Sequence, residues 1–422
     1  MIEGHDILCF APGPWDDIWR NRHHIMTRLA RANRVLYVEP WTYLRPTLRR
    51  LRSGQIRLTG LQGPRLSQIS TNLYVCRPPL WAPRADRFPL SVITQAVYMA
   101  FLQRVLKRLR FQGPILWLFL PDMEIFVGHF DEKLVIYHIV DEYVGYSGVS
   151  EAWRPVVQRM EQQLARRADL VFVTAPTLYE SKRDLNEQVF LVPNAVDYEA
   201  FTAVLEANVP PPADMATVRS PIAGYVGAIN DKLDLTLLAR VARSCVDGPS
   251  ASERGWSVVL VGPVTITDEE GQRALDTLRA LPHVHLLGRK GVEEVPRYIA
   301  ACDVCLLPYR INEWTRNIDS LKLYEYLACG KPVVATDLPA AQRFSEVVRI
   351  AAGEAEFLAN MNAALNEDHP ALQTKRRRVA AQHTWEQRVN SLSAAIEGRL
   401  RERPLLQAGK RILEGEVQDN GS

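Results

Sequence analysis

The sequence lacks several features that would place the protein outside the globular, intracellular proteins. It has no run of about 18 apolar residues, so we expect no helix that spans a membrane. The first apolar run is interrupted by charges, which argues against a signal peptide. The six cysteines are scattered rather than paired, which favours a reducing compartment. We therefore expect a cytoplasmic protein.

Strong charge and metal-binding patterns are also missing. The formal net charge is only +3, so composition gives no indication of a nucleic-acid partner. Cys302 and Cys305 form a lone Cys-x-x-Cys without a second pair or a nearby histidine, and core packing explains them better than metal or redox chemistry. No Asp-x-Asp pair follows an apolar run in the second half. We expect no metal site and no cofactor.

Short apolar runs alternate with stretches of helical length along nearly the whole chain, which predicts an α/β fold with parallel sheets. The runs lie at residues 7–10, 35–38, 115–120, 134–140, 170–174 and 189–192, and again at 224–227, 258–261, 284–287, 304–307 and 333–336. A proline-rich segment, residues 209–214, interrupts the pattern and reads as a linker region. The composition, 47% apolar and 23% charged residues, is typical of a globular protein. The chain is long enough for two or three globular domains.

The most informative segment is residues 303–336, which predicts a strand, a loop, a helix and a second strand. Asp319 and Ser320 are good N-caps for a helix that begins at Leu321. Gly330 is placed to end that helix in the left-handed conformation, and Pro332 prevents it from resuming.

A helix that begins at the carboxyl end of a parallel strand binds phosphate well, because its free N–H groups and its dipole both favour an anion. Lys322 adds a positive charge near that end. Glu325, three residues later on the same face, adds a carboxylate that can accept hydrogen bonds from sugar hydroxyls. This combination suits a nucleoside diphosphate sugar.

The segment Leu321-Lys-Leu-Tyr-Glu-Tyr-Leu-Ala-Cys-Gly-Lys-Pro332 resembles the donor-site signature of the glycosyltransferase family 4 superfamily, and most of all its TuaH-type branch. The resemblance implies a glycosyltransferase-B fold, with two Rossmann-like domains, a cleft between them and a C-terminal crossover helix. It also implies that Glu325 contacts the nucleotide ribose. The family's first glutamate is replaced by Asn317, which leaves the transferred sugar open.

Two further segments resemble the family's domain boundaries. Residues 192–197 resemble the turn that closes the first domain, and residues 383–386 resemble the last turn before the crossover helix. They predict an acceptor domain over 1–196 and a donor domain over 197–384. A crossover helix over 385–404 would pack on the first domain, and a flexible tail would follow over 405–422.

Other residues at predicted strand ends complete the candidate donor site. Glycines there let the backbone approach a phosphate, and nearby cations can neutralise it. The donor candidates are Gly227, Lys232, Gly262, Arg289, Arg316, Asn317, Ser320, Leu321, Lys322 and Glu325. Lys232 is equally open to interpretation as a solvated lysine, and Arg289 as a helix-capping arginine.

In the first domain, the strand that contains His138 ends in two carboxylates, Asp141 and Glu142. A carboxylate at this edge can stabilise positive charge that develops on a sugar ring. Asp141 is the first catalytic candidate, followed by Glu142 and His138, although Asp141 could instead cap the next helix. Gly13 and Trp15 follow the first strand and resemble the family's acceptor-side loop.

The family resemblance therefore implies a retaining, metal-independent glycosyltransferase. It would move a sugar from a nucleoside diphosphate to a hydroxyl acceptor, such as a cell-envelope glycan or a lipid-linked saccharide. A nucleotide-sugar epimerase of the same fold and an inactive nucleotide-sugar-binding partner subunit are the alternatives.

Two basic, apolar-rich segments, residues 44–52 and 98–110, suit peripheral attachment to the inner face of an anionic plasma membrane. They are equally compatible with ordinary surface helices.

Overall fold

The computed structural model divides the protein into two compact units. The first contains Met1–Val140, Ser150–Val192 and Val389–Ser422, and the second contains Asp141–Val149 and Pro193–Arg388. The residues described are 1–43, 65–79, 83–85, 89–143, 151–207, 209–244 and 255–419, with side chains described up to residue 402. The predicted basic segment at 44–52 lies outside them. The chain passes between the units after residues 140, 149, 192 and 388, and the predicted domain boundaries at residues 196 and 384 stay predictions.

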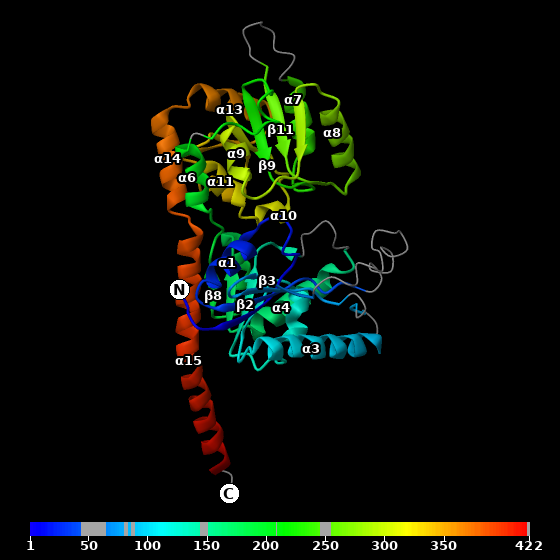
Figure 1. Ribbon diagram of the computed structural model, residues 1–422, viewed down its shortest axis with the longest axis vertical. Helices are drawn as coiled ribbons and strands as arrows, with labels where there is room; N and C mark the ends of the chain where they lie inside the picture. The colour runs from blue at the N-terminus through cyan, green and yellow to red at the C-terminus, as the bar shows by residue number, and fades with distance from the viewer. Residues whose placement is uncertain are drawn as a thin grey trace. The chain divides into compact units, whose positions relative to one another are not determined.

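The first unit is built on an eight-stranded sheet (Figure 1). Its strand order is β3-β4-β2-β1-β5-β6-β7-β8, and all neighbouring strands are parallel except the β3–β4 pair. The strands are β1 (Asp6–Phe10), β2 (Arg34–Val38), β3 (Leu66–Ser70), β4 (Leu73–Cys76), β5 (Ile115–Leu118), β6 (Leu134–Ile139), β7 (Leu170–Val173) and β8 (Val189–Leu191). The helical elements are α1 (Asn21–Leu29), α3 (Leu90–Leu109), η2 (Pro121–Phe126), α4 (Arg154–Arg167) and α5 (Pro176–Lys182).

The second unit has a six-stranded, wholly parallel sheet in the order β13-β11-β9-β14-β15-β16. These strands are β9 (Ile222–Val226), β11 (Ser257–Val261), β13 (Val284–Gly288), β14 (Val304–Leu307), β15 (Val333–Thr336) and β16 (Val348–Ala351), and β10 (Ile229–Asn230) pairs with β12 (Val264–Thr265) beside the sheet. The helices are α6 (Tyr198–Glu206), α7 (Leu235–Ser244), α8 (Glu269–Arg279), α9 (Val295–Ala300), α10 (Glu313–Arg316), α11 (Leu321–Ala328), α12 (Pro339–Gln342), α13 (Glu354–Asn366) and α14 (Pro370–Ala381).

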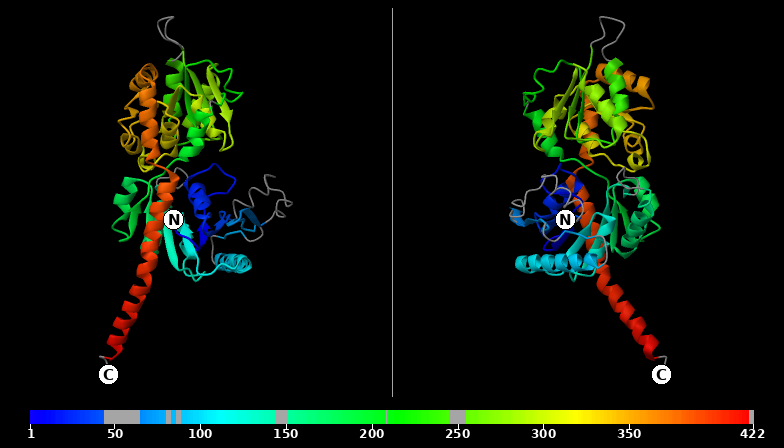
Figure 2. Two further views of the ribbon diagram at one scale, coloured as in Figure 1. Left: turned by 60° about the vertical axis from the view of Figure 1, so that its left-hand side comes forward. Right: turned by 90° about the vertical axis from the view of Figure 1, so that its right-hand side faces the viewer.

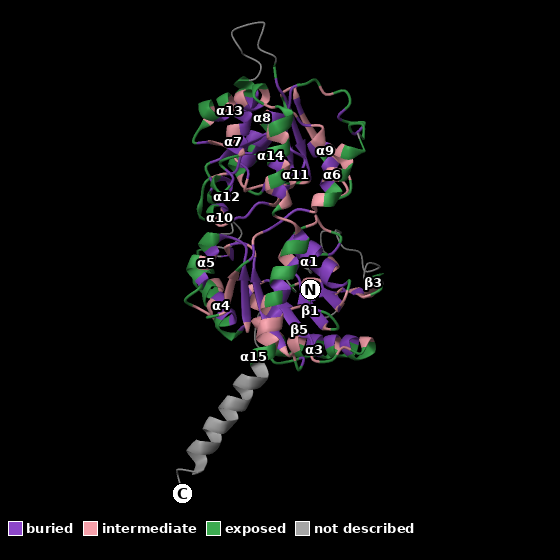
Figure 3. Cartoon of the chain, turned by 90° about the vertical axis from the view of Figure 1, so that its left-hand side faces the viewer, coloured by how far each residue is buried: buried purple, intermediate pink, exposed green. Residues whose placement is uncertain are grey.

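The central strands of both sheets are buried on both faces, which explains why they read as continuous apolar runs. Every residue of β1, β5, β9, β11 and β14 is buried, and Figure 3 shows the strands of each unit enclosed by helices whose outer faces are exposed. In the second unit, α9 contacts β9 and α11 contacts β14 and β15, whereas α13 packs with α7. Both units are therefore Rossmann-like, as predicted.

The last helix, α15 (Trp385–Asp419), begins in the second unit and continues in the first (Figure 2). Val389, Leu392 and Ile396 form its buried face within the first unit. The structure differs from the predicted flexible tail over 405–422, because α15 continues to Asp419. That segment contains three Leu, two Glu and two Gln, which are good helix formers even where the composition is polar.

Helix α11 begins and ends where its sequence predicts. Ser320 is its N-cap residue in an extended conformation, and Gly330 follows the helix with a φ of 69°, in the left-handed region that glycine adopts most easily. The buried side chains of α11 face the sheet, and among them the hydroxyl of Tyr326 accepts a hydrogen bond from the Val226 N–H at 3.0 Å. Tyr326 thereby fixes α11 to the carboxyl end of β9.

Among the helices of the described ranges, none is both long enough and apolar enough to cross a membrane.

We predict that Tyr326→Phe lowers the free energy of unfolding by about 1–3 kcal/mol, because it leaves the buried Val226 N–H without an acceptor. Urea denaturation of the full chain measures this. Tyr74→Phe is the control, since the Tyr74 hydroxyl makes only a long, exposed contact of 3.4 Å with Thr71 O. Equal effects of the two substitutions would contradict the proposed attachment of α11 to β9.

Candidate functional site

The site lies at the carboxyl edge of the second sheet, where α11 starts beside the ends of β9 and β11. Ser320 is buried, and its Oγ lies 3.3 Å from the Tyr309 hydroxyl. The backbone N–H groups of Leu321 and Lys322 have no acceptor among the described residues. This end of α11 therefore presents unsatisfied donors and the positive end of the helix dipole.

The Lys322 side chain lies directly over Gly227, at the end of β9. A Cβ atom on Gly227 would come within 2.0 Å of Lys322 Cε and 2.6 Å of its Nζ, so only glycine leaves room for the lysine. The same glycine has a φ of 147°, which a side chain would strain. On its other side Lys322 Nζ lies 5.3 Å from the centre of the Tyr225 ring.

Gly262, at the end of β11, lies against the same backbone. A Cβ atom there would come within 2.0 Å of Gly227 O, and its own φ is 144°. Hydrogen bonds from Gly227 N to Val261 O at 2.7 Å and from Gly262 N to Gly288 O at 2.8 Å join the ends of three adjacent strands. The structure thus brings the predicted residues Gly227, Gly262 and Lys322 into mutual contact at the carboxyl edge of the sheet. We call these three residues the interlocked edge.

A second lysine, Lys232, adds positive charge to this edge. Its Nζ lies 4.7 Å from the centre of the Trp314 ring and 3.8 Å from Asp141 Oδ1. Asp141, the first catalytic candidate, belongs to the second unit together with the residues after it. The lysine is mostly buried rather than solvated, which favours a role in the site over that of a surface residue.

The positive charges of the two lysines affect the pKa of Tyr309, which follows β14. Burial raises the pKa of Tyr309, but the charges of Lys322 and Lys232, together with hydrogen bonds to Ser320 and Tyr225, lower the pKa below its ordinary value. Both cations therefore act on one small, buried region beside Ser320. Sequence reasoning did not identify Tyr309, because a tyrosine after a strand carries no signal of its own.

Glu325 lies one turn into α11, half-buried. Burial raises the pKa of Glu325 to about 6, while the Lys322 charge acts in the opposite direction. Among the described residues no hydrogen-bond donor binds its carboxylate, so both oxygens remain for hydroxyl groups of a ligand.

Just before α11, Asp319 is buried and fully engaged. Its oxygens accept hydrogen bonds from Asn194 N at 2.6 Å and from the Tyr324 hydroxyl at 2.9 Å, and they pair with Arg343 Nη1 at 3.1 Å. Burial raises the pKa of Asp319 to about 6 despite these partners. Asp319 was predicted only as a helix cap, whereas it holds the loop before α11 in place.

The remaining donor candidates lie on the same edge with less defined roles. Arg316 is exposed at the end of α10, and Arg289 is exposed after β13. Asn317 donates from Nδ2 to Glu313 O at 2.8 Å, which satisfies the end of α10 and leaves Oδ1 for a ligand. Their assignment to the donor site stays a prediction.

In the first unit, the structure contradicts the catalytic role predicted for His138. Its ring is 1% exposed, lies among Trp117, Phe119 and Phe172, and has neither nitrogen hydrogen-bonded. Burial lowers the pKa of His138 to about 3, so it is a neutral core residue. Glu142, beside Asp141, is only partly buried, and its role stays a prediction.

The predicted acceptor-side loop follows β1. Gly13 is buried, and its carbonyl accepts a hydrogen bond from the Tyr37 hydroxyl at 2.8 Å. The Trp15 ring is also buried, packed edge-on against Tyr37 and His23. Trp15 therefore anchors the loop and does not present a free ring face.

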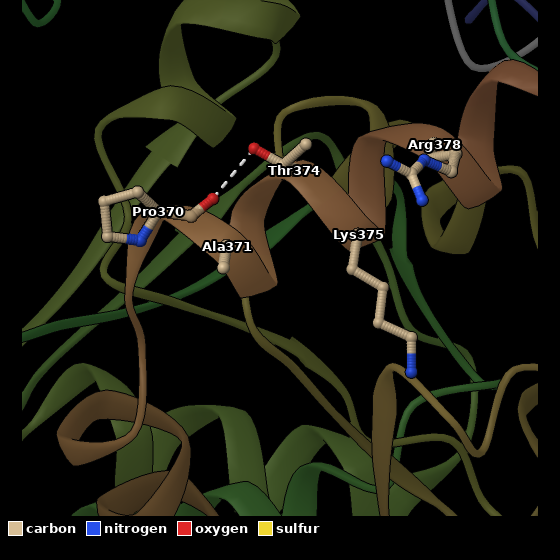
Figure 4. Close-up of a pocket in the computed structure, with 5 residues that line it drawn as sticks. All are labelled: Pro370, Ala371, Thr374, Lys375 and Arg378. Carbon is tan, nitrogen blue, oxygen red and sulfur yellow. Dashed lines mark hydrogen bonds between the residues drawn. The ribbon is translucent and has the colours of Figure 1, made fainter.

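A separate hollow of about 350 Å³ lies along α14 (Figure 4). Its lining residues are Pro370, Ala371, Thr374, Lys375 and Arg378. The Thr374 hydroxyl is bonded to Pro370 O within the helix, and Lys375 pairs with Glu346. None of the candidate site residues lines this hollow. The described residues also contain no group of three or more His, Cys, Asp or Glu side chains placed to hold a metal ion.

Comparisons with known proteins agree with this geometry. The family model described as glycosyl transferases group 1 matches residues 220–368, which span the interlocked edge and α11. The chain is also 28% identical over 284 residues to TuaH of Bacillus subtilis (strain 168), covering 64% of this chain and 68% of the relative. TuaH carries a provisional name as a teichuronic acid biosynthesis glycosyltransferase.

The chain is a glycosyltransferase with a fold of the GT-B type. Solved structures show the same fold. Sucrose-phosphate synthase from Thermosynechococcus elongatus matches with a TM-score of 0.65 at 17% identity, over 96% of this glycosyltransferase and 100% of that chain. The trehalose-phosphate synthase from Burkholderia vietnamiensis matches with a TM-score of 0.67 at 12% identity, over 95% and 100%. HepE from Anabaena, solved with UDP and glucose, matches with a TM-score of 0.64 at 14% identity, over 94% and 100%.

We predict that Lys322→Ala weakens binding of a diphosphate by about 1.5–3 kcal/mol, the range of a charge-assisted hydrogen bond. Calorimetric titration with pyrophosphate, UDP and GDP measures this. Lys331→Ala, which removes a lysine near the opposite end of α11, should leave the affinity unchanged. If Lys322→Ala binds all three ligands like the parent, the diphosphate is held elsewhere.

Glu325→Gln should stabilise the fold while it removes a carboxylate from the site. The pKa of Glu325 in the folded protein lies above its ordinary value, so the folded state disfavours the charged form and loses stability as pH rises through about 4.5 to 6. The variant should therefore be more stable than the parent by on the order of 1 kcal/mol at pH 8, and the difference should vanish near pH 4.5.

Urea denaturation at several pH values tests this expectation. Glu199→Gln, an exposed position in α6, is the control and should show no such difference. A gain for Glu325→Gln that is the same at every pH would refute the assignment.

Proposed function

We propose that this glycosyltransferase transfers a sugar, with retention of configuration, from a nucleoside diphosphate to a hydroxyl group of a cell-envelope saccharide. The observation that carries the proposal is the contact between Lys322 and Gly227 at the start of α11. It places a cation, free backbone N–H groups and a glycine backbone at one point, as a diphosphate requires.

The donor fits the remaining groups of this edge. A diphosphate bound at Ser320 and Lys322 leaves Glu325, one helical turn away, to accept hydrogen bonds from the ribose hydroxyls. HepE, with the same fold, was solved in complex with UDP and with UDP-glucose. These structures support a nucleoside diphosphate sugar as the donor.

Departure of the diphosphate is the chemical step that the site has to favour. Negative charge grows on the leaving phosphate, and we propose that Lys322 and Lys232 stabilise it without a metal ion. Asp141, 3.8 Å from Lys232, would stabilise the positive charge that develops on the sugar ring at the same time. One cation and one carboxylate side by side match the two charges that separate as the bond breaks.

The acceptor proposal draws on the similarity to TuaH, whose name refers to teichuronic acid biosynthesis. We extend it to this glycosyltransferase as a saccharide acceptor of the cell envelope, free or lipid-linked.

Transfer assays with UDP- and GDP-sugars and a panel of alkyl glycosides test the proposal. We expect turnover in EDTA, and NMR of the initial product should show the anomeric configuration of the donor. Asp141→Asn should keep the donor affinity near that of the parent and slow transfer by about 100-fold. Inversion of configuration would overturn the retaining mechanism. A requirement for added metal would overturn metal independence, and parental rates in Asp141→Asn would overturn the catalytic role of Asp141.

We also propose that α3 holds the protein at an anionic membrane surface. The helix contains no acidic residue, and its exposed side chains divide into two groups along its length. Val92, Ile93 and Val97 are exposed apolar residues near its start. Arg104, Lys107 and Arg108 are exposed cations near its end. Apolar side chains can enter the interface while the cations bind lipid phosphates.

Sedimentation with vesicles of phosphatidylglycerol and phosphatidylcholine tests this role of α3. The parent should bind them and should bind pure phosphatidylcholine weakly. The double variant Lys107→Gln/Arg108→Gln should bind about 30-fold less tightly, since each basic residue contributes about 1 kcal/mol. Lys375→Gln/Arg378→Gln on α14 is the charge-matched control. Equal losses in both double variants would show that only the net charge matters.

A further inference from the structure

A buried arginine in the first unit is not explained by the donor site. Arg22 lies in the first turn of α1, and its side chain is only 5% exposed. Its Nε donates to the Tyr37 hydroxyl at 2.8 Å, and that hydroxyl in turn donates to Gly13 O. The guanidinium group is therefore held against the loop that follows β1. A Cβ atom on Gly13 would come within 2.7 Å of Arg22 Nη2.

Arg22 has one counter-ion among the described residues, Asp17, but its terminal nitrogens lack hydrogen-bond acceptors. Nη1 and Nη2 make no hydrogen bond, and the ion pair of Nη2 with Asp17, at 3.8 Å, is too long to be one. The other carboxylates of this region are engaged: Glu39 accepts from Trp15 N and pairs with Arg77, and Asp16 pairs with Arg77. Neither terminal nitrogen is sealed from solvent, because neither is among the buried atoms without a partner.

The neighbours of Arg22 respond to this charge. Burial first, and then the positive charge of Arg22, lower the pKa of His23 to about 3. His23 is thus neutral and adds no charge of its own. The N–H donors on Nη1 and Nη2 therefore have no acceptor among the described residues, and an oxyanion ligand would supply one.

We propose that Arg22 binds an oxyanion of the acceptor, so that this glycosyltransferase acts on an anionic saccharide. The two terminal nitrogens form a planar fork that matches a carboxylate or a phosphate in two parallel hydrogen bonds. A side chain at position 13 would collide with Nη2, so only glycine leaves this nitrogen uncovered there. The inference rests on the proposed function and adds the charge of the acceptor to it.

Thermal unfolding of the full chain at constant ionic strength tests the proposal with four probes. Glucuronate and galacturonate carry a carboxylate, glucose 6-phosphate carries a phosphate, and glucose is the neutral reference. We expect the parent to be stabilised by at least one anionic probe and not by glucose. The probe that raises the unfolding temperature most shows whether the acceptor carries a carboxylate, as in a uronic acid, or a phosphate.

Arg22→Met should lose the whole anion-dependent shift. In buffer without anionic sugar it should be no less stable than the parent, because an apolar side chain of similar length replaces buried N–H donors that have no acceptor. Arg22→Lys keeps the charge but not the planar fork, and should retain a reduced shift. Arg20→Gln, an exposed position next to α1, is the control and should retain the full shift.

Calorimetric titration with UDP and GDP separates this inference from the proposed function. Arg22→Met should bind a nucleoside diphosphate like the parent. A parent that binds the nucleotide but is stabilised equally by glucose and by the anionic sugars overturns the inference alone. So does an Arg22→Met variant that keeps the anion-dependent shift, or one that is less stable than the parent by itself. Loss of nucleotide binding in Arg22→Met would reassign Arg22 to the donor.

Discussion

The buried carboxylate of Asp319 determines how α11 is presented at the sheet edge. It precedes the helix by two residues and accepts hydrogen bonds from Asn194 and Tyr324 while it pairs with Arg343. Asn194 lies in the segment by which the chain enters the second unit, and its carbonyl accepts a bond of 3.4 Å from Arg388, just before the chain leaves that unit. The carboxylate therefore joins the helix N-terminus to the segment at Asn194, which in turn contacts Arg388.

Next to the N-terminus of α11, the candidate donor site holds charged side chains in buried positions, which lowers the stability of the fold. Glu325 and Asp319 both have a pKa of about 6, because burial disfavours their charged forms. Lys322 is confined between the Gly227 backbone and the Tyr225 ring. Such groups are costly to hold in place before a ligand arrives, and in return they need little reorganisation when it does.

Local sequence signals explain how much of the fold and of the candidate site could be predicted. The limits of α11 follow from Ser320 and Gly330, and the apolar runs gave most strands, because short-range patterns decide both. Strand β16 was missed because Arg349 interrupts its apolar run, and β3 because it is mostly exposed. His138 was misjudged because a strand buried on both faces offers no alternation that tells core from edge. The partners of Asp319 lie far away in sequence, so no local pattern reveals them.

The path of α15 has a consequence for how the protein is made. Val389, Leu392 and Ile396 complete the buried face of the first unit, yet they are synthesised only after the whole of Pro193–Arg388. On the ribosome, the second unit thus has its full sequence while the first still lacks one of its helices. The unit that begins the chain is therefore the last to be completed. A nascent chain that ends before residue 389 exposes the apolar surface that α15 covers, and chaperones bind such surfaces.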